Sequence, residues 1–248
     1  MKIHNLINRR ITKFCKRTMA LTLALLFVMP SISYSILNGY KSVKAAGEDG
    51  NEYTPATAGT SLMACFPDEN FAKYVYEKVL GHNNWSNDRT DYKLTASDVE
   101  NIQNLTEINN TGGMSIADIT GIQNFTNLTH LNVYSNQLQY LPDNLPSSLT
   151  ELVVYYNQLQ SLPALPESLT ELNVSNNQLQ YLPALPESLT ELNVSNNQLQ
   201  YLPALPESLT KLEAYENQLK SLPDNLPASL TELWAYDNQL KELPELPA

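Results

Sequence analysis

The same twenty residues occur twice in direct succession near the middle of this 248-residue chain. The stretch LPALPESLTELNVSNNQLQY fills residues 162–181, and residues 182–201 repeat it letter for letter. Alignment on a Leu-Thr pair gives six units of 20 or 21 residues, which start at Leu128, Leu149, Leu169, Leu189, Leu209 and Leu230. A degenerate unit precedes them, so that the repeats fill residues 105–248. A period of this length predicts a solenoid, in which each unit packs only against its neighbours.

Each unit combines a strand with a proline-rich return. The Leu-x-Val alternation is typical of a half-buried strand, and strands of successive units must then pair in parallel. The return, LPALPES in the duplicated units, carries two prolines, which remove N–H donors and disfavour helix at the residue before each of them. The sequence therefore predicts an α/β-type repeat solenoid with a concave parallel β-sheet and extended, polyproline-like convex returns.

An asparagine follows the strand in every unit, where the backbone must turn. A buried amide at such a position can donate to and accept from main-chain groups that would otherwise remain unpaired. We therefore interpret this column as a structural ladder and not as a set of ligands. Its members are Asn136, Asn157, Asn177, Asn197, Asn217 and Asn238.

The N-terminal residues have the pattern of a secretory signal peptide. A basic region precedes the apolar run MALTLALLFVM, which is too short to span a bilayer, and residues 43–45 offer a cleavage site. We expect a signal peptide over 1–45 and a flexible linker over 46–64; an uncleaved N-terminal anchor is the alternative. Secretion or display at the cell surface follows from this prediction, and no membrane insertion of the mature chain is expected.

Removal of residues 1–45 takes away eight basic side chains and no acidic one, which moves the formal charge from −11 to −19. Such a surface repels nucleic acid, because nucleic-acid binding depends on cationic contacts to phosphate, and it attracts basic partners. Cys65 is the only cysteine of the mature chain and is expected to be a small buried side chain.

Residues 65–104 are predicted to form a helical cap that covers the first strand of the sheet. Phe71, Tyr74, Val75 and Val79 share one face of a helix, and Thr95 with Asp98 matches a capping box at the start of a second helix. The intervening NDRTDYKLTASD fits a calcium loop poorly, because arginine and tyrosine occupy positions that need a ligand and a glycine.

The motif L-x-x-L-x-V-x-x-N-Q-L-x-x-L-P-x-L-P resembles bacterial leucine-rich repeats. The LPxLP returns are similar to the short repeats of YopM- and IpaH-type effectors, and the cap resembles that of secreted internalin-like proteins of Gram-positive bacteria. The resemblance covers about residues 65–248. It implies a curved solenoid whose concave strand face binds other macromolecules.

Exposed aromatic and acidic side chains of the strands are the candidate partner-binding residues. They are Tyr134, Tyr155, Tyr156, Tyr215, Trp234, Tyr236, Glu151, Glu171, Glu191 and Glu213. Aromatic residues also simply cover strands, which leaves a structural role open for them. No catalytic or metal-binding motif is present, and no cofactor is expected.

The predicted function is therefore non-catalytic binding of a protein or a surface glycan by a monomer. One alternative is a recognition module of a longer effector or enzyme that is truncated at Ala248. Another is a structural protein of the cell envelope.

Overall fold

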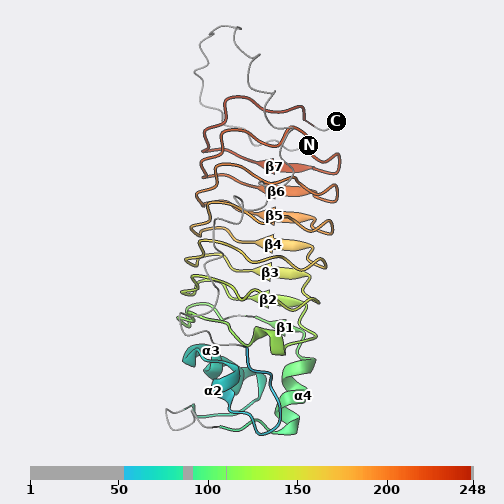
Figure 1. The fold of residues 1–248 in the computed structure, drawn as a ribbon. Helices are drawn as coiled ribbons and strands as arrows, with labels where there is room; N and C mark the ends of the chain where they lie inside the picture. Colours follow the sequence, from blue (N-terminus) through green and yellow to red (C-terminus); the bar gives the residue numbers. More distant parts are fainter. Residues whose placement is uncertain (1–52, 86–91, 110, 247–248) are drawn as a thin grey trace, which may run out of the picture. The chain divides into compact units, whose positions relative to one another are not determined.

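The computed structural model describes residues 53–85, 92–109 and 111–246 of the chain. Within these residues seven strands form one sheet in the order β1 to β7, and every neighbouring pair is parallel. In Figure 1 the coils lie one above another, with the helices at the end next to β1. The predicted solenoid with a parallel sheet is confirmed.

The helical elements precede the repeats or lie in the first of them. They are α2 (Leu62–Cys65), α3 (Glu69–Tyr74), the π-helical turn η1 (Val75–Val79), α4 (Ala96–Asn104) and the 3-10 turn η3 (Ile122–Asn124). The strands are short and one falls in each unit. They are β1 (Glu107–Ile108), β2 (His130–Asn132), β3 (Glu151–Val153), β4 (Glu171–Asn173), β5 (Glu191–Asn193), β6 (Lys211–Glu213) and β7 (Glu232–Trp234).

The register of the sheet aligns equivalent positions of successive units. Glu171 pairs with Glu191 and Asn173 pairs with Asn193, and the central Leu172 lies beside Leu192. Since side chains alternate across a strand, the leucines point into the solenoid and the flanking residues point outward. We call the surface formed by these outward side chains, together with the residues that directly follow each strand, the strand face.

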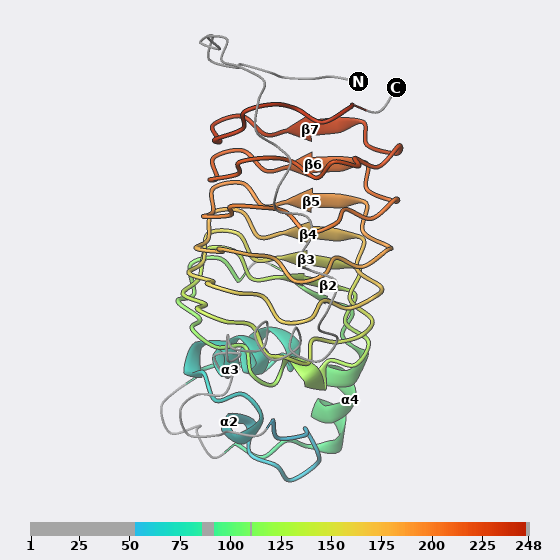
Figure 2. The same ribbon diagram turned by 45° about the horizontal axis from the view of Figure 1, so that its top comes forward.

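The interior is a continuous stack of leucine and valine side chains. Leu169, Leu172, Val174 and Leu179 of one duplicated unit are at most 1% exposed, and their counterparts in the next unit are buried to the same degree. Burial of each such side chain stabilises the fold by about 1.5–3 kcal/mol. In Figure 2 the strands form one layer of the coils, and the returns lie opposite. The returns of the described units from 162 onward contain neither helix nor strand.

Each of the strands β2 to β7 is followed by a residue in the left-handed backbone region, which turns the chain out of the sheet. The φ angles at these positions lie between 51° and 54°. Asparagine tolerates this conformation better than most residues, and it is present in the two duplicated units. The residues are Ser135, Tyr156, Asn176, Asn196, Glu216 and Asp237.

The asparagine column connects each coil to the one before it. Asn177 Oδ1 accepts a hydrogen bond from Leu159 N at 3.0 Å, and Asn177 Nδ2 donates to Val154 O at 3.0 Å. The same pattern recurs at Asn157, Asn197, Asn217 and Asn238. These amides therefore satisfy backbone groups at the point where the chain leaves the sheet.

A second ladder, which the sequence analysis does not identify, runs along the start of each unit. Ser188 Oγ lies 2.6 Å from Leu169 O and 2.7 Å from Glu167 O of the preceding unit. Thr190 Oγ1 donates to Thr170 O at 3.0 Å. Equivalent serines and threonines repeat these bonds in the neighbouring coils, so hydroxyl groups join the coils on both sides of the leucine at this position.

The cap is built as the helical periodicity predicts, with one difference. Phe71, Tyr74 and Val75 are buried, and Val79 is half-buried. The helix ends in the π-helical turn η1, which the sequence does not predict. Thr95 and Asp98 form the predicted capping box at the start of α4.

The structure differs from the predicted flexible linker over its last twelve residues. Ala56 is 7% exposed and its N–H donates to Asn124 Oδ1 at 2.6 Å, while Leu62 is fully buried in α2. Apolar Ala56 and Leu62 lie in a polar stretch that hides their contribution to the core. The predicted signal peptide lies outside the described residues, as do the first five residues of the weak calcium-loop match. No helix of the described part is both long and apolar enough to cross a membrane.

Candidate functional site

The strand face carries aromatic side chains in two separate groups. In the first, Tyr134 and Tyr155 stack with ring centroids 5.0 Å apart and an interplanar angle of 16°. Tyr156 packs edge-on against Tyr155 at 5.5 Å. The ring of Tyr134 lies so close to Gly112 that a Cβ there would come within 2.6 Å of Tyr134 Cζ. A side chain at this position would therefore displace the Tyr134 ring. We call Tyr134, Tyr155 and Tyr156 the N-terminal aromatic cluster.

The second group lies on the last two strands. Tyr215 and Tyr236 stack almost in parallel, with centroids 4.6 Å apart and an angle of 5°. Trp234 lies 6.5 Å from Tyr215 at an angle of 40°. We call Tyr215, Trp234 and Tyr236 the C-terminal aromatic cluster. The neighbouring carboxylates and the stack itself influence Tyr236, whose pKa is raised first by burial and then by Tyr215 and Glu216.

The two duplicated units separate these clusters. They carry serine at the position that Tyr155 and Tyr215 occupy in the flanking units. Ser175 and Ser195 are 5% and 0% exposed. Their hydroxyls lie 2.8 and 2.7 Å from the Oδ1 atoms of Asn173 and Asn193, and these bonds hold the serines down on the sheet. These serines therefore form a low floor between the two aromatic clusters.

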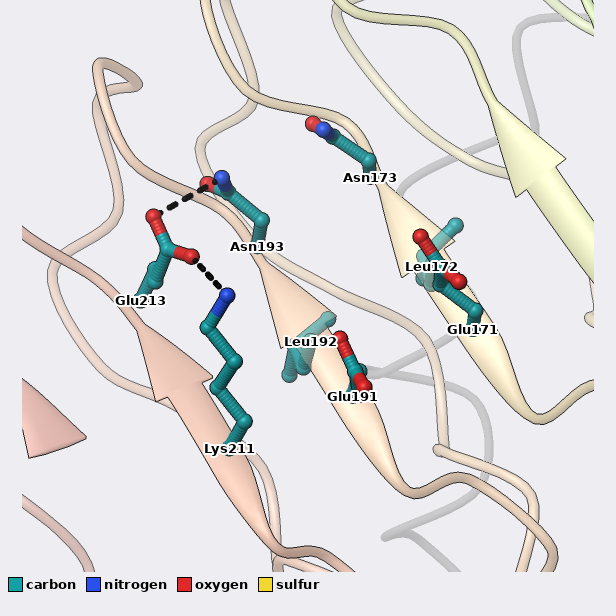
Figure 3. Close-up of a pocket in the computed structure, with 8 residues that line it drawn as sticks. All are labelled: Glu171, Leu172, Asn173, Glu191, Leu192, Asn193, Lys211 and Glu213. Atoms are coloured by element: carbon teal, nitrogen blue, oxygen red, sulfur yellow. Dashed lines mark hydrogen bonds and ion pairs between the residues drawn. The ribbon is translucent and has the colours of Figure 1, made fainter. Parts of the chain in front are cut away.

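A shallow depression of about 60 Å³ lies over the strands β4, β5 and β6. Figure 3 shows its lining, with Glu171 and Glu191 side by side and Lys211 on the next strand. Lys211 Nζ contacts Glu213 Oε1 at 2.8 Å, and the other oxygen of Glu213 accepts a hydrogen bond from Asn193 Nδ2 at 3.1 Å. The Lys211 charge is thus already held by Glu213.

Glu151, Glu171 and Glu191 occupy the first position of three neighbouring strands. Their negative charges lie close together and are only partly compensated by positive charges. His130 Nε2 lies 3.7 Å from Glu151 Oε2, whereas within the described part of the chain neither Glu171 nor Glu191 takes part in a salt bridge. The pKa of Glu171 is raised by burial and by the charges of Glu151 and Glu191, against a smaller lowering by Lys211 and His130. A cation bound beside these carboxylates would therefore reduce their mutual repulsion.

The family and its structural relatives agree with this geometry. The family model described as Leucine Rich Repeat matches residues 168–187 and 188–212. YopM from Yersinia enterocolitica is 42% identical, with a TM-score of 0.54, over 58% of this chain and 31% of its own. The leucine-rich repeat domain of a Shigella effector is 36% identical, with a TM-score of 0.52, over 58% of this chain and 63% of its own. The repeats of this chain have the leucine-rich repeat fold, and the chain resembles these bacterial proteins.

Other comparisons extend beyond the repeats or find nothing. Internalin C2 from Listeria monocytogenes is 26% identical over 76% of this chain and 92% of its own, with a TM-score of 0.48. No curated protein sequence matches the chain. The chain spans less than two thirds of YopM and of the Shigella domain.

Tyr156 differs from every other aromatic residue of these leucine-rich repeats in its backbone. It occupies the left-handed turn position with φ 53° and is 58% exposed, whereas the duplicated units have Asn176 and Asn196 there. A left-handed conformation costs a non-glycine residue roughly 1–2 kcal/mol, and asparagine pays less of this cost. An exposed tyrosine at this position gains little burial in return, so its presence is not explained by stability.

The structure also exposes two tyrosines that the sequence analysis does not single out. Tyr181 and Tyr201 are 41% and 59% exposed and occupy the same position of the two duplicated units, directly before the proline-rich return. They lie outside the strand face and belong to neither aromatic cluster. Their recurrence at the end of NQLQY is the signal that could have identified them.

Three titratable side chains of the cap, Cys65, His82 and Asp98, are engaged within the fold. Cys65 is fully buried, and burial raises the pKa of its thiol to about 11, which keeps it protonated at neutral pH. Tyr92 Oη donates to Asp98 Oδ2 at 2.8 Å and lies 2.8 Å from His82 Nε2. Among the described residues no group of three His, Cys, Asp or Glu side chains could hold a metal ion.

Proposed function

We propose that this leucine-rich repeat protein binds another protein through the strand face, which this fold makes the concave one, and that it performs no catalysis. The observation that supports this most is the pair of aromatic clusters on an outward face whose inward face is already fully packed. Aromatic side chains supply much of the binding energy of protein interfaces at a low cost in conformational entropy. Here they are not needed to fill the core.

The backbone at Tyr156 supports the same conclusion. Residues held in unfavourable backbone regions concentrate at functional sites, where the rest of the fold compensates for the strain. The exposed Tyr156 keeps this conformation although asparagine is available to the chain at the same turn. We infer that its side chain is retained for a contact outside the chain.

We also propose that the protein acts outside the cell that produces it, as a secreted or surface protein. The basic N-terminal region and the short apolar run after it support export. Measurement of the mature N-terminus in the culture medium and in the cell envelope tests this part separately from the binding activity.

The binding proposal is tested by capture of partners on the purified protein, with identification of the cross-linked residues by mass spectrometry. The double variant Trp234→Ser/Tyr236→Ser removes two of the three residues of the C-terminal aromatic cluster and should lose a partner that the parent retains. The matched control is Tyr181→Ser/Tyr201→Ser, which removes two exposed tyrosines outside the strand face. Circular dichroism must stay unchanged in both variants.

Three results would overturn the proposal. Equal retention of partners by both double variants would show that the strand face is not the binding surface. Retention of glycans and of no protein would assign the aromatic clusters to carbohydrate. Retention of nothing, by a protein that is found only within the assembled cell envelope, would favour the structural role.

A further inference from the structure

The gap between the two aromatic clusters is bounded by the ring of Tyr155, which Tyr156 contacts, and by the ring of Tyr215. The stacking partner of Tyr155 comes from the preceding strand, so its other face is turned toward the coil of Ser175. The stacking partner of Tyr215 comes from the following strand, so its other face is turned toward the coil of Ser195. Three strand steps of about 4.8 Å separate the planes of the Tyr155 and Tyr215 rings by roughly 14 Å.

The width of this gap suits one helix. Two aromatic rings occupy about 3.5 Å of the 14 Å, which leaves roughly 10 Å, the diameter of an α-helix with its side chains. A single extended strand would fill only about half of that width. The floor is low, because Ser175 and Ser195 are tied to Asn173 and Asn193. The gap is open along the strand direction, toward Glu171 and Glu191.

Two separate features of the gap favour a positively charged occupant. Glu171 and Glu191 lie at its edge without a salt bridge among the described residues, and the nearest lysine is held by Glu213. The ring faces of Tyr155 and Tyr215 carry the negative quadrupole of an aromatic ring, which attracts guanidinium and ammonium groups. An acidic or neutral helix would leave both features unused.

Resting on the proposed function, we propose that a basic helical segment of the partner protein lies along the strands in this gap, with lysine or arginine side chains over Glu171 and Glu191 and against Tyr155 and Tyr215. The identical units then act as the spacer that sets the width of the gap. Recognition depends on how many coils separate the two clusters and also on which residues the clusters contain.

The charge requirement is tested with a fluorescent alanine-based helical peptide that carries arginine at every fourth position. Its binding is followed by anisotropy, alongside the same peptide with glutamate in place of arginine. We expect Glu171→Gln/Glu191→Gln to weaken binding at least tenfold. The control Glu167→Gln/Glu187→Gln removes the same charge from exposed residues on the returns and should change binding less than twofold. Equal losses in the two double variants would refute a site at the gap.

The width requirement is tested by a change in the number of units. Deletion of residues 182–201 joins Tyr181 to Leu202, and the same sequence already occurs in the chain around Tyr181 and Leu182. Strand β4 then pairs with β6, and because β4 and β5 are identical in sequence this pair reproduces the native pair of β5 and β6. Every contact between coils therefore has a native counterpart, and the fold should persist with one strand fewer. Insertion of a third copy is conservative for the same reason.

The two length variants separate the gap from simple charge attraction. The insertion adds carboxylates and widens the gap by about 4.8 Å. Attraction by charge alone predicts equal or tighter binding of the arginine peptide, whereas a gap fitted to one helix predicts at least tenfold weaker binding. The deletion, which narrows the gap, should also bind at least tenfold more weakly.

Unchanged binding in both length variants would overturn the inference. A parent protein that does not bind the arginine peptide, yet loses its captured partner in Trp234→Ser/Tyr236→Ser, would refute the basic helix and leave the proposed function standing. The Trp234→Ser/Tyr236→Ser variant could instead retain both the captured partner and the peptide, with peptide binding still dependent on Glu171 and Glu191. That result would refute the proposed function as stated, and it would not refute the basic helix.

Discussion

Replacement of one asparagine of the ladder should destabilise the whole stack by an amount that the hydrogen bonds define. Asn177 Oδ1 accepts from Leu159 N at 3.0 Å, and its Nδ2 lies within hydrogen-bond distance of Val154 O, Val174 O and Ser175 O. The side chain is buried, with 9% exposure. Asn177→Ala removes all of these bonds and offers no polar group instead.

The bonds do not count equally, because some of the carbonyls have a second donor. Val154 O also accepts from Asn157 Nδ2 at 3.1 Å, and Val174 O is shared with the next asparagine in the same manner. Within the described residues the Leu159 N–H has no acceptor other than Asn177. An orphaned buried N–H costs about 1–3 kcal/mol, and the weakened carbonyl bonds add about 1 kcal/mol. We expect a loss of about 2–4 kcal/mol in the free energy of unfolding.

Urea denaturation followed by circular dichroism measures this loss, with Gln178→Ala as the matched control. Gln178 is the exposed neighbour of Asn177 and contributes only its backbone N–H, which bonds to Leu159 O at 2.9 Å. Asn238→Ala, at the half-buried last coil, should cost less than Asn177→Ala, because water can reach the freed Leu219 N–H. A loss at Asn177 no larger than that at Gln178 would refute the assignment of the ladder as a hydrogen-bonding element.

Two further perturbations test the turns and the cap. Glu216→Asn should raise the midpoint of urea denaturation, because asparagine relieves part of the roughly 1–2 kcal/mol cost of φ 51°, while Glu207→Asn should not raise it. Burial alone would raise the pKa of Asp98, but hydrogen bonds from Thr95 and Tyr92 and the charge of His82 hold it below its ordinary value. That contribution is complete above the unfolded pKa of about 3.9 and is lost as pH falls through the lower folded pKa. Asp98→Asn should therefore cost about 1 kcal/mol at neutral pH and progressively less below pH about 3.9; the same cost at both ends of a pH series would contradict this.

The sequence predicts the repeat architecture well because each unit sees the same environment. Leu172 and Leu192 are interior for the same physical reason, and the alternation around them fixes which side chains face outward. The prolines of the return exclude helix without any knowledge of the neighbours. Local rules therefore suffice wherever a residue's surroundings are copies of its own unit.

Prediction becomes weaker where the environment is not a repeat. Ala56 and Leu62 belong to the core only because Asn124 and the buried cap residues lie beside them, and no periodicity in residues 46–64 indicates this. The burial of Ser175 likewise depends on a hydrogen bond to Asn173. Contacts that arise from a single pair of side chains leave no pattern in the sequence.

The candidate site lies between these two cases. The outward position of Tyr155 and Tyr215 follows from the alternation, but their stacking depends on the neighbouring unit, which must also carry a tyrosine. The ring faces that bound the gap depend further on the serine units between them. The functional geometry is thus a property of the order of the units, and a unit considered by itself does not contain it.

The duplication has a consequence that unites stability with recognition. Because two identical coils meet their neighbours through native contacts, the number of coils between the aromatic clusters can change with little effect on the packing of the interior. The same change moves Tyr155 and Tyr215 apart by a full strand step of about 4.8 Å, which is large compared with the tolerance of a contact surface. The gain or loss of a whole unit would therefore change the proposed gap while each leucine keeps its surroundings. Point substitutions on the strand face alter the chemistry of the walls, whereas the unit count alters the width between them, so the two variables can be measured independently in this chain.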